Sequence, residues 1–249
     1  MKVVILAGGL GSRIREQTKS IPKPMIEIKN KPIILRIMEH YSKYGYNDFI
    51  ICGGYKINVI KNFFLNLNTN LSNELDIIYK ENLIKTNLIK SYQNWNIKIV
   101  NTGLNSMTGG RLKLISKHLS EENFFFTYGD GISDVNIDTL LQSHKKSKKL
   151  VTVTAVKPLA RFGEITIRNN LVTSFKEKQQ TSSGWINGGF FVINKKFLKY
   201  IKNKNTILEK EPLEQVCKKK QLNAYKHNGF WQCVDTPRDL EFIEKLIKN

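Results

Sequence analysis

The sequence has little cysteine and no long apolar run, and each shortage removes a class of protein. Its three cysteines, Cys52, Cys217 and Cys233, have no metal-ligand spacing, and an odd number argues against a disulfide framework. No apolar stretch approaches the roughly 18 to 20 residues of a membrane span, and no signal-peptide pattern opens the chain. We therefore expect a cytoplasmic protein without a membrane span, whose cysteines are buried small hydrophobic residues.

Histidine is also scarce. The four histidines, His40, His118, His144 and His227, lie in helical or strand-edge contexts, and we assign none of them to catalysis. No Ser/His/Asp or Cys/His constellation is present, so we do not expect chemistry through a covalent intermediate of that type.

Acidic residues are few beside basic ones. The chain holds 40 Lys and Arg against 21 Asp and Glu, a formal net charge of +19. Such an excess fits a nucleic-acid surface, an anionic membrane surface or a site for phosphorylated substrates. The lysines are spread along the chain in runs such as 145–149 and 195–204, which is typical of solvated faces. A nucleic-acid-binding module, with affinity that falls steeply with salt, remains an alternative, but no aromatic stacking pattern favours it.

The organisation of the chain predicts one domain over residues 1–249. At 41% hydrophobic the chain can bury a large core, and it has no internal repeat or low-complexity linker. Strands and helices alternate, which favours an α/β fold with helices on both faces of a sheet. We expect strands at 3–6, 48–54, 124–130 and 150–156, and helices at 32–44, 56–65 and 136–146.

The second half is richer in strands, which we expect at 164–167, 171–177, 188–193 and 230–235, before a final helix from Pro237. The segment 66–96 differs from the rest because it is polar and weakly periodic. It fits an extended hairpin or a subunit-contact excursion, and the sequence does not choose between them.

The first chemistry-bearing stretch is LAGGLGSR at 6–13. Gly8, Gly9 and Gly11 follow a buried strand, where backbone N–H groups can approach phosphate oxygens without obstruction. The spacing matches neither the dinucleotide fingerprint nor the P-loop, and a plain tight turn would explain two of the glycines. Arg13 favours a nucleotide-binding loop over a plain turn, because its guanidinium supplies donors for a triphosphate where the loop ends.

A lysine and two carboxylates complete the pattern. Lys23 stands between two prolines that stiffen its turn, which favours a phosphate contact. Asp130 ends a buried strand and Asp235 ends another, where a hard cation could bridge them to phosphate oxygens. A helix-capping role for Asp130 explains that stretch alone equally well, but the two carboxylates together indicate a magnesium site.

These motifs resemble, in order and over nearly the whole chain, those of the sugar-1-phosphate nucleotidylyltransferase family. The stretches that carry the resemblance are LAGGLGSR, PKPM at 22–25, YGDG at 128–131, FKEK at 175–178, INGG at 186–189 and VDTPRD at 234–239. The stretch NTGLNSMTGGRLK at 101–113 is most similar to members that transfer a cytidylyl group to glucose 1-phosphate.

The resemblance implies a single Rossmann-like nucleotidyltransferase domain with a mixed, mostly parallel sheet and helices on both faces. It implies that CTP and a sugar 1-phosphate, glucose 1-phosphate above all, give CDP-glucose and pyrophosphate with Mg²⁺. It also implies a homo-oligomer, no nucleic-acid partner and a role in nucleotide-sugar supply for lipopolysaccharide or capsule polysaccharide. A thymidylyl- or uridylyltransferase and a catalytically silent nucleotide-binding relative remain as alternatives.

The resemblance also assigns roles to residues. Catalysis would use Arg13, Lys23 and Asp130, and the metal would bind Asp130 and Asp235. The nucleotide would contact Leu6, Ala7, Gly8, Gly9, Gly11, Ser12, Thr102, Gly109, Gly110 and Arg111. The sugar would contact Gly129, Glu164, Lys178, Asn187 and Gly188, with Gly189 letting the backbone pass close. Ser12 stands where relatives often carry threonine, and it keeps the hydroxyl.

Overall fold

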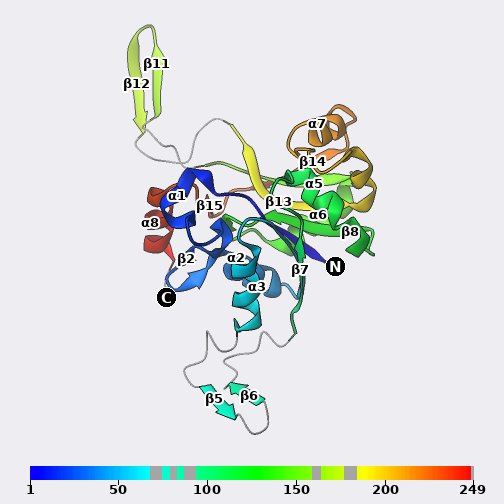
Figure 1. Cartoon of the computed structure of the whole chain (residues 1–249). Helices are drawn as coiled ribbons and strands as arrows, with labels where there is room; N and C mark the ends of the chain where they lie inside the picture. Colours follow the sequence, from blue (N-terminus) through cyan, green and yellow to red (C-terminus); the bar gives the residue numbers. More distant parts are fainter. Residues whose placement is uncertain (68–74, 79–82, 87–93, 159–163, 177–183, 248–249) are drawn as a thin grey trace.

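The computed structural model describes residues 1–67, 75–78, 83–86, 94–158, 164–176 and 184–247. Its centre is a seven-stranded sheet in the order β14-β10-β13-β8-β1-β4-β7 (Figure 1). The strands are β1 (Val3–Ala7), β4 (Asp48–Gly53), β7 (Asn96–Asn101), β8 (Asn123–Tyr128), β10 (Val151–Val156), β13 (Ile186–Asn194) and β14 (Leu222–His227). Only β13 runs against its neighbours in this sheet, so the predicted mixed, mostly parallel sheet is confirmed.

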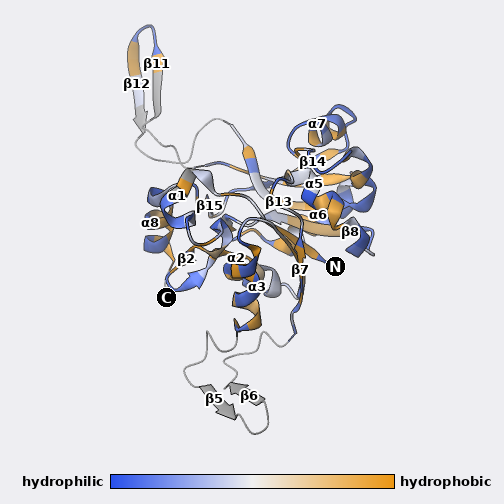
Figure 2. Cartoon of the chain, in the orientation of Figure 1, coloured by the Kyte–Doolittle hydropathy of each residue, from blue (hydrophilic) through white to orange (hydrophobic). Residues whose placement is uncertain are grey.

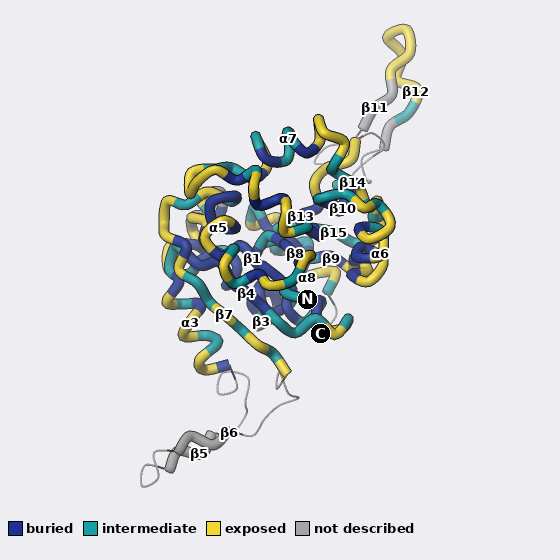
Figure 3. The backbone as a smooth tube through the Cα atoms, turned by 90° about the vertical axis from the view of Figure 1, so that its right-hand side faces the viewer, coloured by how far each residue is buried: buried dark blue, intermediate teal, exposed yellow. Residues whose placement is uncertain are grey.

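The side chains of the central strands alternate between two hydrophobic cores, one on each face of the sheet. In β1, Val3 and Ile5 belong to the first core, whereas Val4 and Leu6 belong to the second. This period of two is a property of the extended backbone, and strands that are apolar at every position must be covered on both faces. The orange strands at the middle of Figure 2 and the dark blue tube at the centre of Figure 3 mark this buried sheet.

Helices cover both faces of the central sheet. The first core includes buried residues of α2 (Ile33–Ser42), α3 (Ile57–Leu65), α6 (Ile137–Ser147) and α8 (Pro237–Leu246). The second includes residues of α5 (Thr108–Leu114), the 3₁₀ helix η5 (Lys195–Tyr200) and α7 (Glu211–Lys218). The shorter turns are η1 (Ser12–Ile14), α1 (Arg15–Thr18), η2 (Lys23–Met25) and η4 (Ser116–His118). The expectation of helices on both faces is therefore confirmed.

Four two-stranded antiparallel pairs lie outside the main sheet: β2 (Glu27–Ile28) with β3 (Lys31–Pro32), β5 (Leu75–Ile78) with β6 (Leu83–Thr86), β9 (Gly131–Ser133) with β15 (Trp231–Cys233), and β11 (Glu164–Arg168) with β12 (Leu171–Lys176). The pairs β5–β6 and β11–β12 stand away from the central sheet (Figure 1). Within the segment 66–96, residues 68–74, 79–82 and 87–93 lie outside the described residues. Its role in subunit contact stays a prediction.

Every helix and strand expected from the apolar pattern is present, with ends shifted by a few residues. The sequence pattern missed α5, α7, β7 and β14, and also the short elements α1, β2, β3 and β9. Both missed strands of the sheet lie at its edges and alternate in exposure, so they lack the continuous apolar run that marks β1, β4 and β8. In the described part of the chain, no helix combines the length and apolarity that crossing a bilayer requires.

Candidate active site

The carboxyl ends of four parallel strands, β1, β4, β7 and β8, meet at one edge of the sheet, where α/β proteins bind their ligands. A pocket of about 430 Å³ opens at this edge. It is lined by Leu6, Ala7, Gly8, Gly9, Gly11, Ser12, Lys23, Pro24, Ser106, Met107, Thr108, Arg111, Tyr128, Gly129, Asp130 and Asp235. Eleven residues with predicted site roles are among them, drawn from segments far apart in the sequence.

At one end of the pocket the Lys23 ammonium lies between two carboxylates. Its Nζ is 2.6 Å from Asp130 Oδ2 and 2.6 Å from Asp235 Oδ1. The Lys23 side chain is only 12% exposed, and those of Asp130 and Asp235 are 32% and 19% exposed. Burial opposes the charge on Lys23, but the two carboxylates outweigh it and raise the pKa of Lys23 above its usual value. The lysine is therefore charged at neutral pH.

The backbone explains why these three residues meet. Lys23 begins η2, where Met25 N donates to the Pro22 carbonyl, and the two prolines leave the turn little freedom. Asp130 follows β8 after one residue, Gly129. Asp235 arrives from far along the chain because β15 pairs with β9 and Val234 N donates to the Asp130 carbonyl at 2.9 Å.

A helix cap then fixes the chain on the far side of Asp235. Thr236 and Asp239 form a capping box at the start of α8, and Asp239 Oδ2 also accepts from the Asp235 backbone N–H at 3.0 Å. The second acidic residue of the VDTPRD motif therefore orders the turn, while the first faces the pocket.

The donor set at this point fits a divalent cation. The Lys23 ammonium already stands between the two carboxylates, so a positive charge is held at the place where a metal would lie. Among the described residues no group of three or more His, Cys, Asp or Glu side chains could hold a metal. One or two carboxylates completed by phosphate oxygens and water is the usual environment of Mg²⁺. The site suits a cation that arrives with a polyphosphate.

The glycine loop owes its shape to packing as well as to ligand access. A Cβ on Gly8 would lie 2.1 Å from Arg111 Nη1, and one on Gly129 would lie 2.5 Å from the Leu6 carbonyl oxygen. Gly11 adopts a φ of +63°, in the left-handed region that favours glycine. Gly9 has open space beside it, as a residue facing a ligand would.

Arg111 is buried beneath this loop, and its guanidinium donates to the protein itself. Nη1 contacts Gly53 O at 3.2 Å, Thr102 Oγ1 at 2.7 Å and Gly103 O at 2.8 Å. Nη2 contacts Gly8 O at 2.8 Å and Leu104 O at 3.2 Å. Burial lowers the pKa of Arg111. The side chain joins the loops that follow β1, β4 and β7.

The predicted nucleotide residues Thr102, Gly109 and Gly110 are absent from the lining of the 430 Å³ pocket. Thr102 is buried and donates its hydroxyl to Gly53 O at 2.6 Å. A Cβ on Gly109 would meet the Thr206 carbonyl oxygen at 2.9 Å, and one on Gly110 would meet that of Lys204 at 2.0 Å. These glycines let α5 pack closely on the segment 204–206, and Ser106, Met107 and Thr108 before them face the pocket.

A second hollow of about 200 Å³ lies on the other side of the carboxylates. Asn187, Gly188 and Gly189 line it, together with Trp231 and Cys233. They belong to β13 and β15, and β13 reaches this edge because it runs antiparallel to β8. Trp231 Nε1 donates to Gly188 O at 2.6 Å, and Gly189 has a φ of +80° with Tyr128 packed against it.

Tyr128, Asp130 and Asp235 line both hollows, so the two spaces meet at Tyr128 and the two carboxylates that contact Lys23. Burial raises the pKa of Tyr128, as does the neighbouring Glu209. The sequence analysis gave no role to Tyr128, Thr108 or Trp231. The position of Tyr128 directly before the glycine at the end of β8 is the signal that could have identified it.

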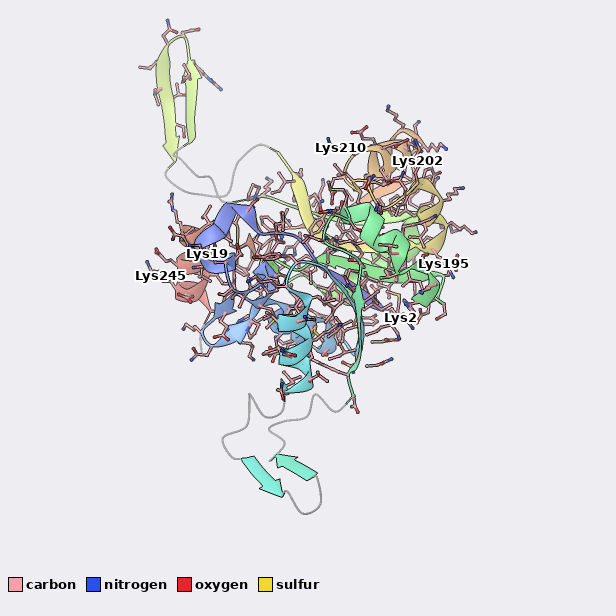
Figure 4. The ribbon with its side chains drawn as sticks, in the orientation of Figure 1. Lys2, Lys19, Lys195, Lys202, Lys210 and Lys245 are labelled. Carbon is pink, nitrogen blue, oxygen red and sulfur yellow. The ribbon has the colours of Figure 1, made fainter. Side chains whose placement is uncertain are left out.

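Three predicted site residues cannot be placed in this geometry. Lys178 lies outside the described residues, and so do the side chains of Arg13 and Glu164. Their roles stay predictions. The four histidines line neither hollow. The lysines labelled in Figure 4 come from different parts of the chain and are spread around the molecule.

An α/β sheet with a glycine loop, a lysine and two carboxylates at its carboxyl edge defines a phosphate-handling protein of the nucleotide-binding class. The family model described as Nucleotidyl transferase matches residues 2–248. The chain belongs to this nucleotidyl transferase family.

Relatives of similar length match nearly the whole chain. The glucose-1-phosphate cytidylyltransferase of Salmonella typhimurium is 45% identical over 247 residues, covering 99% of this chain and 95% of the relative. A probable glucose-1-phosphate cytidylyltransferase of Bacillus subtilis is 37% identical over 254 residues, covering 99% and 96%. Among solved structures, HddC from Yersinia pseudotuberculosis, complexed with GMP-PN, superimposes with a TM-score of 0.73 at 22% identity and 99% coverage of both chains. That likeness shows the shared fold.

Proposed function

We propose that this enzyme transfers the cytidylyl group of CTP to glucose 1-phosphate, giving CDP-glucose and pyrophosphate. The observation that carries the proposal is the meeting of two hollows at Lys23, Asp130 and Asp235, because nucleotidyl transfer needs two phosphorylated substrates side by side. The two relatives just described support the choice of base and sugar.

The chemistry asks the protein for position and charge. The sugar phosphate oxygen is already an anionic nucleophile, so it can attack the α-phosphorus in line while pyrophosphate departs. The enzyme must bring two polyanions together and stabilise the charge that develops between them. Lys23 is placed to do this, because its ammonium can leave a carboxylate and contact the phosphates as they approach.

Asp130 and Asp235 would hold Mg²⁺ beside that lysine. Bound there, the cation would neutralise the developing negative charge on the phosphates. The two carboxylates would hold the cation, and Arg13 at the end of the glycine loop is proposed to meet the same phosphates. The aspartates thus contribute through the cation, and the lysine contributes directly.

The larger hollow is proposed to take the nucleotide and the smaller one the sugar. Leu6 to Gly11 and Ser12 would line the nucleotide. Asn187 and Gly188 would face the glucose in the smaller hollow, joined by Glu164 and Lys178. Gly129 lines the larger hollow between Tyr128 and Asp130, so it would face the glucose from the nucleotide side. Cytosine offers an amine donor where uracil and thymine offer a carbonyl acceptor, so backbone groups can distinguish them. Thr102 and Arg111 would act through the loops they hold, and Gly109 and Gly110 through the wall that α5 forms.

The wider setting is also proposed. All three cysteines are free thiols, which suits the reducing cytoplasm. Cys52 is buried as expected, but Cys217 is exposed and Cys233 is partly exposed, so the expectation of burial is wrong for these two. A homo-oligomer is proposed from the family resemblance, and no nucleic-acid partner is invoked.

The direct test measures pyrophosphate release for each pairing of CTP, UTP, dTTP, ATP and GTP with glucose 1-phosphate and other sugar 1-phosphates. A mismatched pyrimidine leaves a polar group unpaired, so CTP should lead UTP and dTTP by about ten- to a hundredfold in kcat/KM. Equal or faster turnover with UTP or dTTP would assign the thymidylyl or uridylyl alternative. Nucleotide binding without turnover in any pairing would assign the silent relative.

A further inference from the structure

Glu209 is an exposed residue in the turn before α7, and it touches both walls of the site. Its Oε1 accepts a hydrogen bond from the Tyr128 hydroxyl, and its Oε2 accepts one from the Thr108 hydroxyl at 2.6 Å. Thr108 lines the larger hollow, and Tyr128 lines both. One carboxylate therefore ties the start of α5 to the end of β8.

The bridge continues into the smaller hollow. Because Tyr128 donates its proton to Glu209, its oxygen is left to accept, and Asn187 Nδ2 donates to it at 3.3 Å. Asn187 Oδ1 accepts from the Gly189 backbone N–H at 2.8 Å. These two contacts fix which way the amide faces, and they leave the second N–H of Nδ2 available to a ligand.

Without the Glu209 carboxylate, the orientations of the Tyr128 hydroxyl and the Asn187 amide would no longer be fixed. The Tyr128 hydroxyl would seek another acceptor, and the amide oxygen of Asn187 is close by. An amide turned to accept that proton would no longer accept from Gly189 N. Thr108 would be affected less, since its oxygen still accepts from Leu208 N at 2.9 Å and Leu208 is fully buried.

We propose that Glu209 is a positioning residue that orients Tyr128 and Asn187 for the sugar substrate and links the sugar wall to the nucleotide wall. The substrate it serves rests on the proposed function. The residue touches neither the reacting atoms nor the metal carboxylates, so its effect passes through the side chains it holds.

Kinetics of Glu209→Ala test the proposal. The KM for glucose 1-phosphate should rise about tenfold, as expected for a charge-assisted hydrogen bond lost from an orienting network. The KM for CTP should change much less, and the melting temperature should stay near that of the unmodified enzyme because Glu209 is exposed. Glu209→Gln keeps one acceptor and should recover part of the loss. The matched control is Glu214→Ala, an exposed glutamate on α7 that lines neither hollow.

A double-mutant cycle with Tyr128→Phe gives the second arm. If Glu209 acts through Tyr128, the double variant should bind sugar no worse than Tyr128→Phe alone. Additive losses, or kinetic constants unchanged in Glu209→Ala, would overturn the proposal. A lower melting temperature with unchanged KM values would overturn it as well, because it would leave only a structural role.

The third arm does not depend on turnover. In a ¹⁵N-correlated NMR spectrum the Asn187 side-chain NH₂ signal, assigned by its loss in Asn187→Ser, should move in Glu209→Ala and stay in place in Glu214→Ala. An unmoved signal would refute the orienting network whatever the substrates prove to be. An unmodified enzyme inactive with CTP and glucose 1-phosphate, combined with a moved signal, would overturn the assigned substrate and keep the network.

Discussion

Two cationic side chains, Arg111 and Lys23, line the same pocket. Their hydrogen-bond partners differ, and the difference suggests a structural role for Arg111 and a chemical role for Lys23. The Arg111 guanidinium is buried among uncharged carbonyl oxygens and a threonine hydroxyl that join three loops. The Lys23 ammonium stands between two partly exposed carboxylates at the point where two hollows meet. A cation whose terminal guanidinium nitrogens donate to loop carbonyls and a buried threonine is held in place by the fold. A cation held by partly exposed carboxylates can exchange them for phosphate, and we propose that Lys23 does so when the substrates bind.

Among the substitutions at this site, Asp130→Asn should reduce turnover most. The amide removes one of the two negative charges at the proposed metal position while leaving the shape unchanged. Turnover should fall by roughly a thousandfold, as for loss of one electrostatic element in a preorganised site. Pyrophosphate release at saturating Mg²⁺, with circular dichroism as the check on folding, measures it. Unchanged turnover would remove Asp130 from the metal site.

Arg111→Met tests the structural cation. It keeps the aliphatic stem but leaves several loop carbonyls without their donor, so the free energy of unfolding should drop by about 3 kcal/mol. Urea denaturation measures the change. A variant that keeps full stability but loses CTP affinity would contradict the account, because Arg111 would then be a ligand of the nucleotide.

Lys23→Met tests the exchangeable cation. Turnover should fall by about a hundredfold, with a smaller change in the KM for CTP, because the contact strengthens as the phosphates approach. Without nucleotide, the ammonium competes with a divalent ion for both carboxylates. Mn²⁺ binding followed by electron paramagnetic resonance should therefore be tighter in the variant than in the unmodified enzyme. A raised KM with normal turnover would reduce Lys23 to a binding role.

The smallest change that we predict is in the pH dependence of stability, and it comes from the buried histidine His144, whose hydrogen-bond partners are uncharged. His144 bonds Thr152 and Asn123, and burial lowers its pKa to about 4, an effect that the charge of Glu122 offsets only in part. Lys23, by contrast, has its pKa raised by its carboxylates. Because the unfolded chain takes up this proton near pH 6.5 and the folded chain does not, stability is lost as pH falls toward 4.

Between pH 7 and pH 5 this linkage should cost about 2 kcal/mol of the free energy of unfolding. His144→Gln should flatten that part of the pH dependence in urea denaturation, and burial of His40, whose pKa is also lowered, leaves a residual slope. An equal slope in both proteins would show that His144 takes up its proton in the folded state.

The fold was largely predictable because its central strands β1, β4 and β8 each contain a continuous apolar run. Strands such as β1 and β8 can be predicted from the sequence alone, because a short run of successive apolar residues is typical of a strand covered on both faces. The edge strands β7 and β14 carry a weaker pattern and could not be distinguished from loops. Lys23, Asp130 and Asp235 could be nominated because prolines or strand ends present them.

The rest of the site depends on contacts between distant parts of the chain. Glu209 meets residues 101 and 81 positions away, and no local pattern marks it. Gly109 and Gly110 suggested a backbone that approaches a ligand, yet the close approach seen in the structure is to the backbone at 204–206. A glycine indicates that something comes near, and only the tertiary structure identifies what it is.

A crystal structure with Mg²⁺ and CDP-glucose tests the central claim most directly. We expect the diphosphate to lie beside Lys23, with the cation on Asp130 and Asp235. The cytosine should occupy the 430 Å³ pocket and the glucose the 200 Å³ hollow. Arg111 should keep its bonds to the loop carbonyls while Lys23 changes partners. A diphosphate bound away from Lys23, or contacted by Arg111 in its place, would contradict it.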